Sequence, residues 1–121
     1  MTEIQNSKQY DLEERTLKFA KRVRSFVKIL PKTTANLEDG KQLIKASGSI
    51  GANYIEANEA LSKKDFIVRI KICRKEAKES RYWLRLIDTL DEKDLENERK
   101  FLENEASELT NIFGSILRKS E

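Results

Sequence analysis

The sequence predicts an all-α protein, an antiparallel four-helix bundle with up-down-up-down connections. One proline and four glycines among 121 residues leave little material for turns, so few and long elements are expected. Apolar residues recur at helical spacing in four long stretches, and only a few polar residues separate one stretch from the next. Charged residues form 37% of the chain, which is typical of helices whose outer faces contact water. A chain of this length forms one domain.

The helices are expected at residues 11–30, 37–61, 63–90 and 95–118. A flexible N-terminal segment at residues 1–10 precedes them. Asp11 followed by Glu14 has the spacing of a capping pair at the start of the first helix, and Pro31 ends that helix. The four lengths correspond to rods of about 30–39 Å, and rods of matching length favour a bundle.

The later helix ends have their own signals. The second helix is expected to begin near Asn36 or Leu37. Ser62 followed by Asp65 has the spacing of an N-terminal cap for the third helix. A polar turn at residues 91–94 separates the third helix from the fourth.

The second helix contains a group of small residues for close helix packing: Ser47, Gly48, Gly51 and Ala52. Glycine inside a helix costs roughly 0.5–1 kcal/mol relative to alanine, so a compensating gain is expected. Two interpretations remain open. The group is a solvated face with two unfavourable glycines, or it lets a neighbouring helix approach closely. The second interpretation predicts that Gly51 faces another helix.

Polar residues next to these small residues predict a buried hydrogen-bond network. Asn53 and Glu56 are expected to be partly buried and bonded to the first or third helix, since unpaired buried polar groups cost roughly 1–3 kcal/mol each. Glu76 and Glu79 lie beside the apolar stripe of the third helix and complete the predicted network.

Nothing in the sequence points to catalysis. The chain has no histidine, which removes the commonest general base and the commonest transition-metal ligand. The single cysteine, Cys73, falls on a helical apolar stripe and is interpreted as a small buried side chain. We therefore expect no enzyme activity, no catalytic residue, no metal and no cofactor. Converging carboxylates of Glu56, Glu76 and Glu79 are the one remaining enzymatic alternative.

The location expected from the sequence is the cytoplasm. No apolar run approaches the ~20 residues that span a membrane, and residues 1–6 lack the pattern of a signal peptide.

Charge is distributed unevenly along the chain. Residues 1–35 and 62–90 carry net charges of +4 and +5, whereas residues 36–61 and 91–121 carry −2 and −4. The first and third helices therefore have basic outer faces, which indicate phosphate binding or contact with acidic faces of neighbouring helices or of another copy. The residues predicted to contact nucleic acid are Arg15, Lys18, Arg22, Lys71, Arg74, Lys75, Lys78, Arg81 and Arg85.

Four segments together resemble a known family. They are residues 10–16 (YDLEERT), 49–57 (SIGANYIEA), 62–66 (SKKDF) and 75–84 (KEAKESRYWL). The set is similar to the bacterial four-helix-bundle proteins called 23S rRNA-intervening-sequence proteins, over roughly residues 10–117. The same superfamily includes the accessory protein of diversity-generating retroelements, which binds nucleic acid and helps a reverse transcriptase.

The resemblance implies a homo-oligomer, a ring of five subunits, and the number five comes only from the family. Two functions follow as expectations. The first is a non-enzymatic protein that binds RNA or DNA through the basic faces of the first and third helices. The alternative is an assembly module that forms a homo-oligomeric ring and serves a partner enzyme. The sequence does not name the nucleic acid, the partner or the location of the gene.

Overall fold

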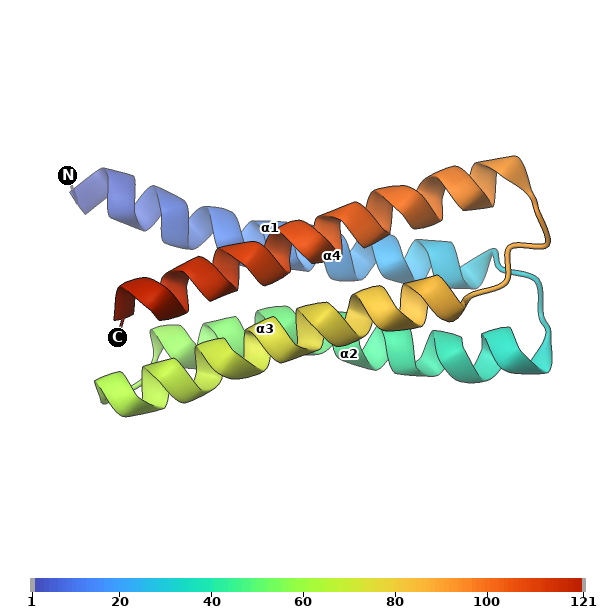
Figure 1. The fold of residues 1–121 in the computed structure, drawn as a ribbon. Helices are drawn as coiled ribbons and strands as arrows, with labels where there is room; N and C mark the ends of the chain where they lie inside the picture. Colours follow the sequence, from blue (N-terminus) through green and yellow to red (C-terminus); the bar gives the residue numbers. More distant parts are fainter. Residues whose placement is uncertain (1, 121) are drawn as a thin grey trace.

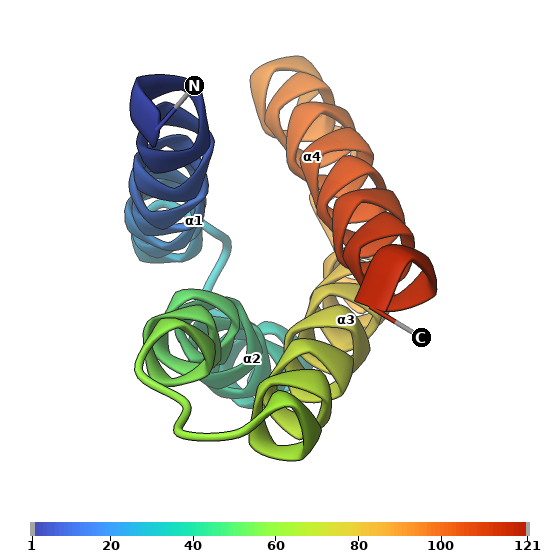
Figure 2. The ribbon, with the colours of Figure 1, turned by 90° about the vertical axis from the view of Figure 1, so that its left-hand side faces the viewer.

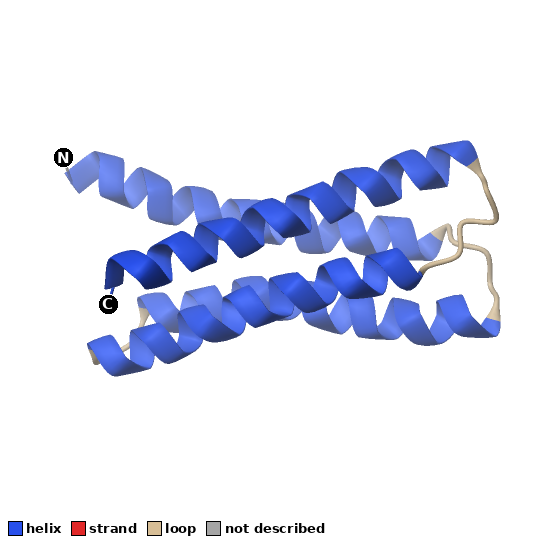
Figure 3. Cartoon of the chain, viewed as in Figure 1, coloured by secondary structure: helices blue, strands red, loops and turns tan. Residues whose placement is uncertain are grey.

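Four long α-helices form nearly the whole chain (Figure 1). The computed structural model describes the backbone of residues 2–120 and the side chains of residues 12–120. The helices are α1 (Thr2–Lys28), α2 (Thr34–Asn58), α3 (Lys63–Leu86) and α4 (Lys93–Ser120). Residues 2–120 contain no strand (Figure 3).

The helices run up, down, up and down along one bundle, as predicted. Each of α1 and α3 packs against both α2 and α4, and the contact between α1 and α4 is the smallest of the four. In the end-on view of Figure 2, α1 and α3 lie at opposite corners. The two basic helices are therefore diagonal across the bundle, and their backbones do not pack against each other within the described residues.

The first helix is longer than predicted. It begins at Thr2, so the predicted start at Asp11 is wrong. Residues 2–10 contain neither glycine nor proline and include several good helix formers, so nothing in them stops the helix. The side chain of Asp11 lies outside the described residues, and the flexibility expected of residues 1–10 stays a prediction.

Two helix starts are set by capping hydroxyls. Thr33 caps α2, where its side chain accepts a hydrogen bond from the Asn36 amide at 3.1 Å, so α2 begins at Thr34, three residues before the predicted start. Ser62 caps α3 as predicted and accepts from the Asp65 amide at 3.1 Å.

The ends of α2 and α3 differ more from prediction. Helix α2 ends at Asn58 rather than 61, and α3 ends at Leu86 rather than 90. The loop after α3 holds Leu90 and Asp91 at φ 53° and 60°, in the left-handed region that a right-handed helix excludes. Ile87 is buried in the core although it lies beyond the end of α3. Because Ile87 keeps the apolar spacing of the helix, the sequence pattern predicted a helix that is too long.

The core runs along the bundle axis. Its largest fully buried side chains are Phe26, Phe113, Leu43, Ile50, Ile70, Leu84, Ile87, Leu102 and Leu109. Tyr54 also packs in the core, where the centroid of its ring lies 5.8 Å from the centroid of the Phe113 ring. Cys73 is also fully buried and its thiol donates to the Ile50 carbonyl oxygen at 3.4 Å. Burial raises the pKa of this thiol to about 12, so Cys73 is an unreactive core residue, as predicted.

The small residues of α2 bring it close to α1. A Cβ added to Gly51 would lie 2.8 Å from Thr16 Oγ1, so the prediction that Gly51 faces another helix is confirmed. A Cβ on Gly48 would lie 3.2 Å from Arg24 Nη2, and Ser47 is fully buried. Ala52 is exposed, so its predicted role in close packing is wrong. One residue turns the helix by about 100°, which carries Ala52 off the face that Gly51 presents to α1.

Replacing Gly51 with leucine should therefore destabilise the bundle by about 1–3 kcal/mol or more, because the added side chain overlaps Thr16. Urea unfolding followed by circular dichroism measures this change. Ala52→Leu is the matched control, since it adds a similar side chain at an exposed position of the same helix, and its unfolding free energy should change by less than about 0.5 kcal/mol. Equal stabilities of the two variants would contradict the packing of Gly51.

Candidate nucleic-acid interface

A basic surface lies between α3 and α4. One part is lined by Lys78, Arg81, Tyr82 and Arg85 of α3 and by Ser107, Thr110 and Asn111 of α4. The adjoining part is lined by Lys71, Arg74, Lys75 and Lys78 of α3 and by Gly114, Leu117 and Arg118 of α4. Lys78 belongs to both parts, so they form one continuous surface, the α3–α4 groove.

The groove follows from the spacing of the basic residues in α3. They recur at steps of three and four, which places their long side chains on one side of the helix. The apolar residues Ile70, Cys73, Ala77 and Leu84 take the opposite, fully buried side. Six of the nine residues predicted to contact nucleic acid thus lie together.

Most of the charges in the α3–α4 groove have no ion-pair partner among the described residues. No acidic residue is among the side chains that line it. Within residues 12–120, Lys75 alone of these α3 cations forms an ion pair, a long one of 3.9 Å to Glu76. Apart from Lys75, the basic residues of α3 in the groove therefore form a strip of positive charge without ion-pair partners among the described residues.

The predicted residues of α1 are placed differently. Arg15 forms a two-pronged ion pair with Glu105, at 2.8 and 2.9 Å, and Arg22 forms the same pair with Glu98, at 2.7 and 2.9 Å. The hydrogen bond to Glu105 raises the pKa of Arg15 further above its usual range. Lys18 is exposed and makes no ion pair with a described residue. Arg15 and Arg22 thus hold α1 to α4, and neither residue lines the α3–α4 groove.

The comparisons with known proteins agree with this fold. A family model described as 23S rRNA-intervening sequence protein matches residues 8–115. The chain belongs to this family. The chain is also similar to a crystal structure of a protein of unknown function from the S23 ribosomal protein family of Bacteroides thetaiotaomicron. The two are 30% identical with a TM-score of 0.78, and the match covers 92% of this chain and 98% of that one. No curated protein matches the chain.

In this member of the 23S rRNA-intervening sequence protein family, Asn53 links α2 to α3 as predicted. Its side-chain oxygen accepts from Arg69 Nη1 at 3.0 Å, and its amide donates to the Ser49 carbonyl oxygen at 2.9 Å. Glu56 is exposed and forms no side-chain hydrogen bond with a described residue, so its predicted place in the network is wrong. A step of three residues turns a side chain by about 60° around the helix, which is enough to carry Glu56 into solvent.

Glu76 and Glu79 line a second groove, between α2 and α3, with Lys45, Tyr82 and Trp83 among its other residues. The Glu76 side chain is only 17% exposed. Burial, and then the neighbouring Glu79, raise the pKa of the Glu76 carboxyl. Among the described residues, no group of three or more His, Cys, Asp or Glu is arranged to hold a metal ion. No described helix combines the length and hydrophobicity needed to cross a membrane.

The raised pKa of Glu76 predicts a dependence of stability on pH. The charged carboxylate is less favourable in the folded state than in the unfolded chain, so Glu76→Gln should raise the melting temperature at pH 7. This gain should shrink as the pH falls and vanish below the unfolded pKa of about 4.3, where the carboxyl is neutral in both states. Glu56→Gln is the control, because Glu56 is exposed. Destabilisation by Glu76→Gln at pH 7 would contradict the prediction.

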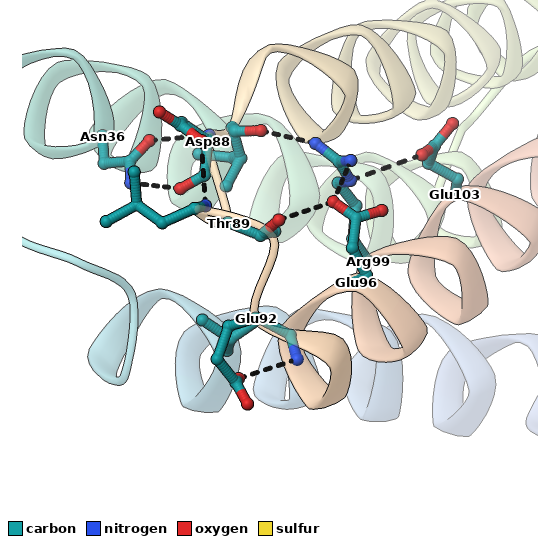
Figure 4. A network of polar contacts seen from close by, with 10 residues as sticks. Asn36, Asp88, Thr89, Glu92, Glu96, Arg99 and Glu103 are labelled. Carbon is teal, nitrogen blue, oxygen red and sulfur yellow. Dashed lines mark hydrogen bonds and ion pairs between the residues drawn. The ribbon is translucent and has the colours of Figure 1, made fainter.

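A polar network that the sequence analysis missed joins two loops at one end of the bundle (Figure 4). Asn36 is only 3% exposed, and its amide nitrogen donates to the carbonyl oxygens of Pro31 at 3.1 Å and Asp88 at 2.8 Å. Its side-chain oxygen accepts from the Asp88 amide at 2.9 Å. Asn36 therefore ties the loop before α2 to the loop after α3.

The other half of this network fixes the start of α4. Arg99 donates to the Ile87 carbonyl oxygen and to Glu96, and the Thr89 hydroxyl donates to the same Glu96 carboxylate. Arg99 also lies 4.0 Å from Glu103. The bonds from Arg99 and Thr89 lower the pKa of Glu96. These residues are structural, since their polar atoms bind one another and the end of α3.

Proposed function

We propose that this protein binds RNA or DNA through the α3–α4 groove and has no enzymatic activity of its own. The observation that carries the proposal is the strip of basic side chains along α3, which no acidic residue of the groove neutralises. Leaving several cations unpaired costs stability through mutual repulsion, and a polyanion offsets that repulsion on binding. The charges of Arg15 and Arg22 are already neutralised by glutamates, so we leave these residues out of the interface.

The length of the strip suits a nucleic-acid backbone. From Lys71 to Arg85 the α3 axis rises by about 21 Å, at 1.5 Å per residue. Phosphates of one strand follow at about 3.4 Å along a duplex axis, so the strip can contact several of them. Such contacts position the protein without reading sequence.

The groove also offers groups that contact bases and sugars. Ser107, Thr110 and Asn111 supply hydrogen-bonding side chains from α4. Tyr82 is 58% exposed, and an exposed aromatic ring beside basic side chains can stack on a base. Trp83 packs against the core instead, and the side chain of Tyr10 lies outside the described residues.

The test is a fluorescence anisotropy titration of labelled single-stranded RNA, single-stranded DNA and duplex DNA, repeated over a series of salt concentrations. We expect binding at physiological salt, with the logarithm of affinity falling linearly as the logarithm of salt rises. Dissociation constants weaker than about 10⁻⁴ M at physiological salt for every probe would contradict the proposal.

A homo-oligomeric ring that serves a partner enzyme is the second candidate. Several large apolar side chains remain exposed in the single chain, including Leu61, Ile29 and Tyr82 at 98%, 64% and 58%. Exposed apolar side chains indicate a contact with another protein where they gather in one patch. Tyr54 is 5% exposed and belongs to the core, so it is not available for such a contact. Five subunits remain the number that the family resemblance implies, and the cytoplasm remains the expected location.

Light scattering at low micromolar concentration tests the oligomer. We expect a mass several times that of the 14.1 kDa chain, both in low salt and in high salt if apolar contacts dominate. A single 14.1 kDa species in both buffers would contradict the oligomer. A different closed ring would contradict only the number five.

A further inference from the structure

Two arginines from different helices meet over a glycine in the α3–α4 groove. A Cβ on Gly114 would lie 3.5 Å from Arg118 Nη1 and 3.6 Å from Arg74 Nε. Neither guanidinium group forms an ion pair or a side-chain hydrogen bond with a residue of the described part of the chain. Lys71, Lys75 and Lys78 line the same part of the groove, again without an acidic residue. Five cations therefore line this one part of the groove.

Stability alone does not account for this arrangement. Arg118 lies in the last turn of α4, where the helix dipole favours a cation, but Arg74 lies in the middle of α3 and has no such benefit. Like charges at close range repel. Gly114 adds its own cost, since glycine inside a helix is about 1 kcal/mol less favourable than alanine. An alanine Cβ would fit there at ordinary contact distances.

We propose that Arg74 and Arg118 form a site for a phosphate monoester, the terminal phosphate of a nucleic-acid strand bound in the groove. This inference rests on the proposed function. Guanidinium groups bind phosphate through paired, charge-assisted hydrogen bonds. A monoester carries a charge of about −1.5 to −2 at pH 7, which suits five surrounding cations better than the single charge of an internal phosphate.

Gly114 and the position of the pair support this assignment. Gly114 is buried, and because it has no side chain both guanidinium groups approach the α4 backbone within this part of the groove. This part of the groove has a volume of about 460 Å³. The pair also lies near the C-terminus of α4, toward one end of the basic strip, where a strand that follows the strip from Arg85 would terminate.

The experiment compares short single-stranded oligonucleotides of one sequence that carry a 5′-phosphate, a 3′-phosphate or neither, each labelled at an end without phosphate or internally. With the wild-type protein, we expect one phosphorylated strand to bind about tenfold tighter or more, the factor expected of charge-assisted hydrogen bonds. Arg118→Gln should abolish this preference, so that phosphorylated and unphosphorylated strands bind this variant with equal affinity.

Arg24→Gln is the matched control, because this substitution removes the same charge from an exposed arginine that faces α2. It should keep the preference for the phosphorylated strand, and circular dichroism should show that both variants fold. Inorganic phosphate, compared with chloride at equal ionic strength, should displace the phosphorylated strand selectively.

The outcomes separate this inference from the proposed function. Equal affinities for phosphorylated and unphosphorylated strands would overturn the terminal-phosphate site and leave nucleic-acid binding intact. Loss of the preference in Arg24→Gln as well as in Arg118→Gln would also overturn the site, as would equal displacement of both strands by inorganic phosphate. Failure of every strand to bind would overturn both proposals.

Discussion

Asn36→Ala should destabilise the protein by about 2–4 kcal/mol. The substitution removes three hydrogen bonds, to the Pro31 carbonyl oxygen and to the carbonyl oxygen and amide of Asp88. Asn36 is almost completely buried, so the backbone groups of Pro31 and Asp88 that face it lose their partners at roughly 1–3 kcal/mol each, less where water reaches them. The loss is large because one side chain joins two loops that are far apart in the sequence. Urea unfolding measures it.

The neighbouring residue provides the control for this prediction. Leu37→Ala changes a half-exposed side chain in the same turn of α2 and should cost less than about 1 kcal/mol. Asn36→Asp keeps the acceptor for the Asp88 amide but faces two carbonyl oxygens with a carboxylate, so it should also destabilise. Stability of Asn36→Ala equal to that of the wild type would show that these bonds do not hold the two loops together.

Replacing Lys78, Arg81 and Arg85 with glutamine should weaken nucleic-acid binding on the order of 100-fold at physiological salt. Each lost phosphate contact lowers the slope of log affinity against log salt by about 0.7 to 0.9, so three lost contacts lower it by about two or more. The three side chains are exposed on one side of α3 and make no ion pair with a described residue, so the fold should be preserved. Anisotropy titrations over a salt series measure both quantities.

A second triple variant distinguishes the loss of groove contacts from the loss of overall positive charge. Lys21, Arg24 and Lys28 are exposed on α1, and replacing them with glutamine removes the same three charges. This variant should bind within a few-fold of the wild type. If both triple variants lose affinity equally, the interaction depends on net charge and not on the α3–α4 groove.

Local patterns predicted most of the fold. The apolar periodicity, the Ser62 cap and the glycine at position 51 depend on neighbours within a few residues, and all three have the predicted structural roles. Predictions of which residues of a helix face a neighbouring helix and which face solvent were less reliable. Ala52 and Glu56 lie one and five residues beyond Gly51, and turns of about 100° per residue carry both into solvent.

Pairing between helices was harder to foresee. Arg15 and Arg22 have the same helical spacing on a basic face as the arginines of α3. Their charges are neutralised only because glutamates of α4 pack opposite them. A signal was nevertheless present, since Arg15 and Arg22 are seven residues apart, as are Glu98 and Glu105. On antiparallel helices these spacings match, and the observed pairs run in the expected opposite order. The bonds between Asn36 and Asp88, 52 residues apart, have no local signature.

The position of the nucleic acid on the protein is the central claim, and an NMR titration of the ¹⁵N-labelled protein with a short oligonucleotide tests it most directly. We predict that amide shifts change along residues 71–85 of α3 and residues 107–118 of α4, which line the groove. The amides of α1 around Arg15 and Arg22, whose side chains are held by glutamates, should change little. Shift changes concentrated on α1, with α3 unaffected, would contradict the α3–α4 groove as the binding surface.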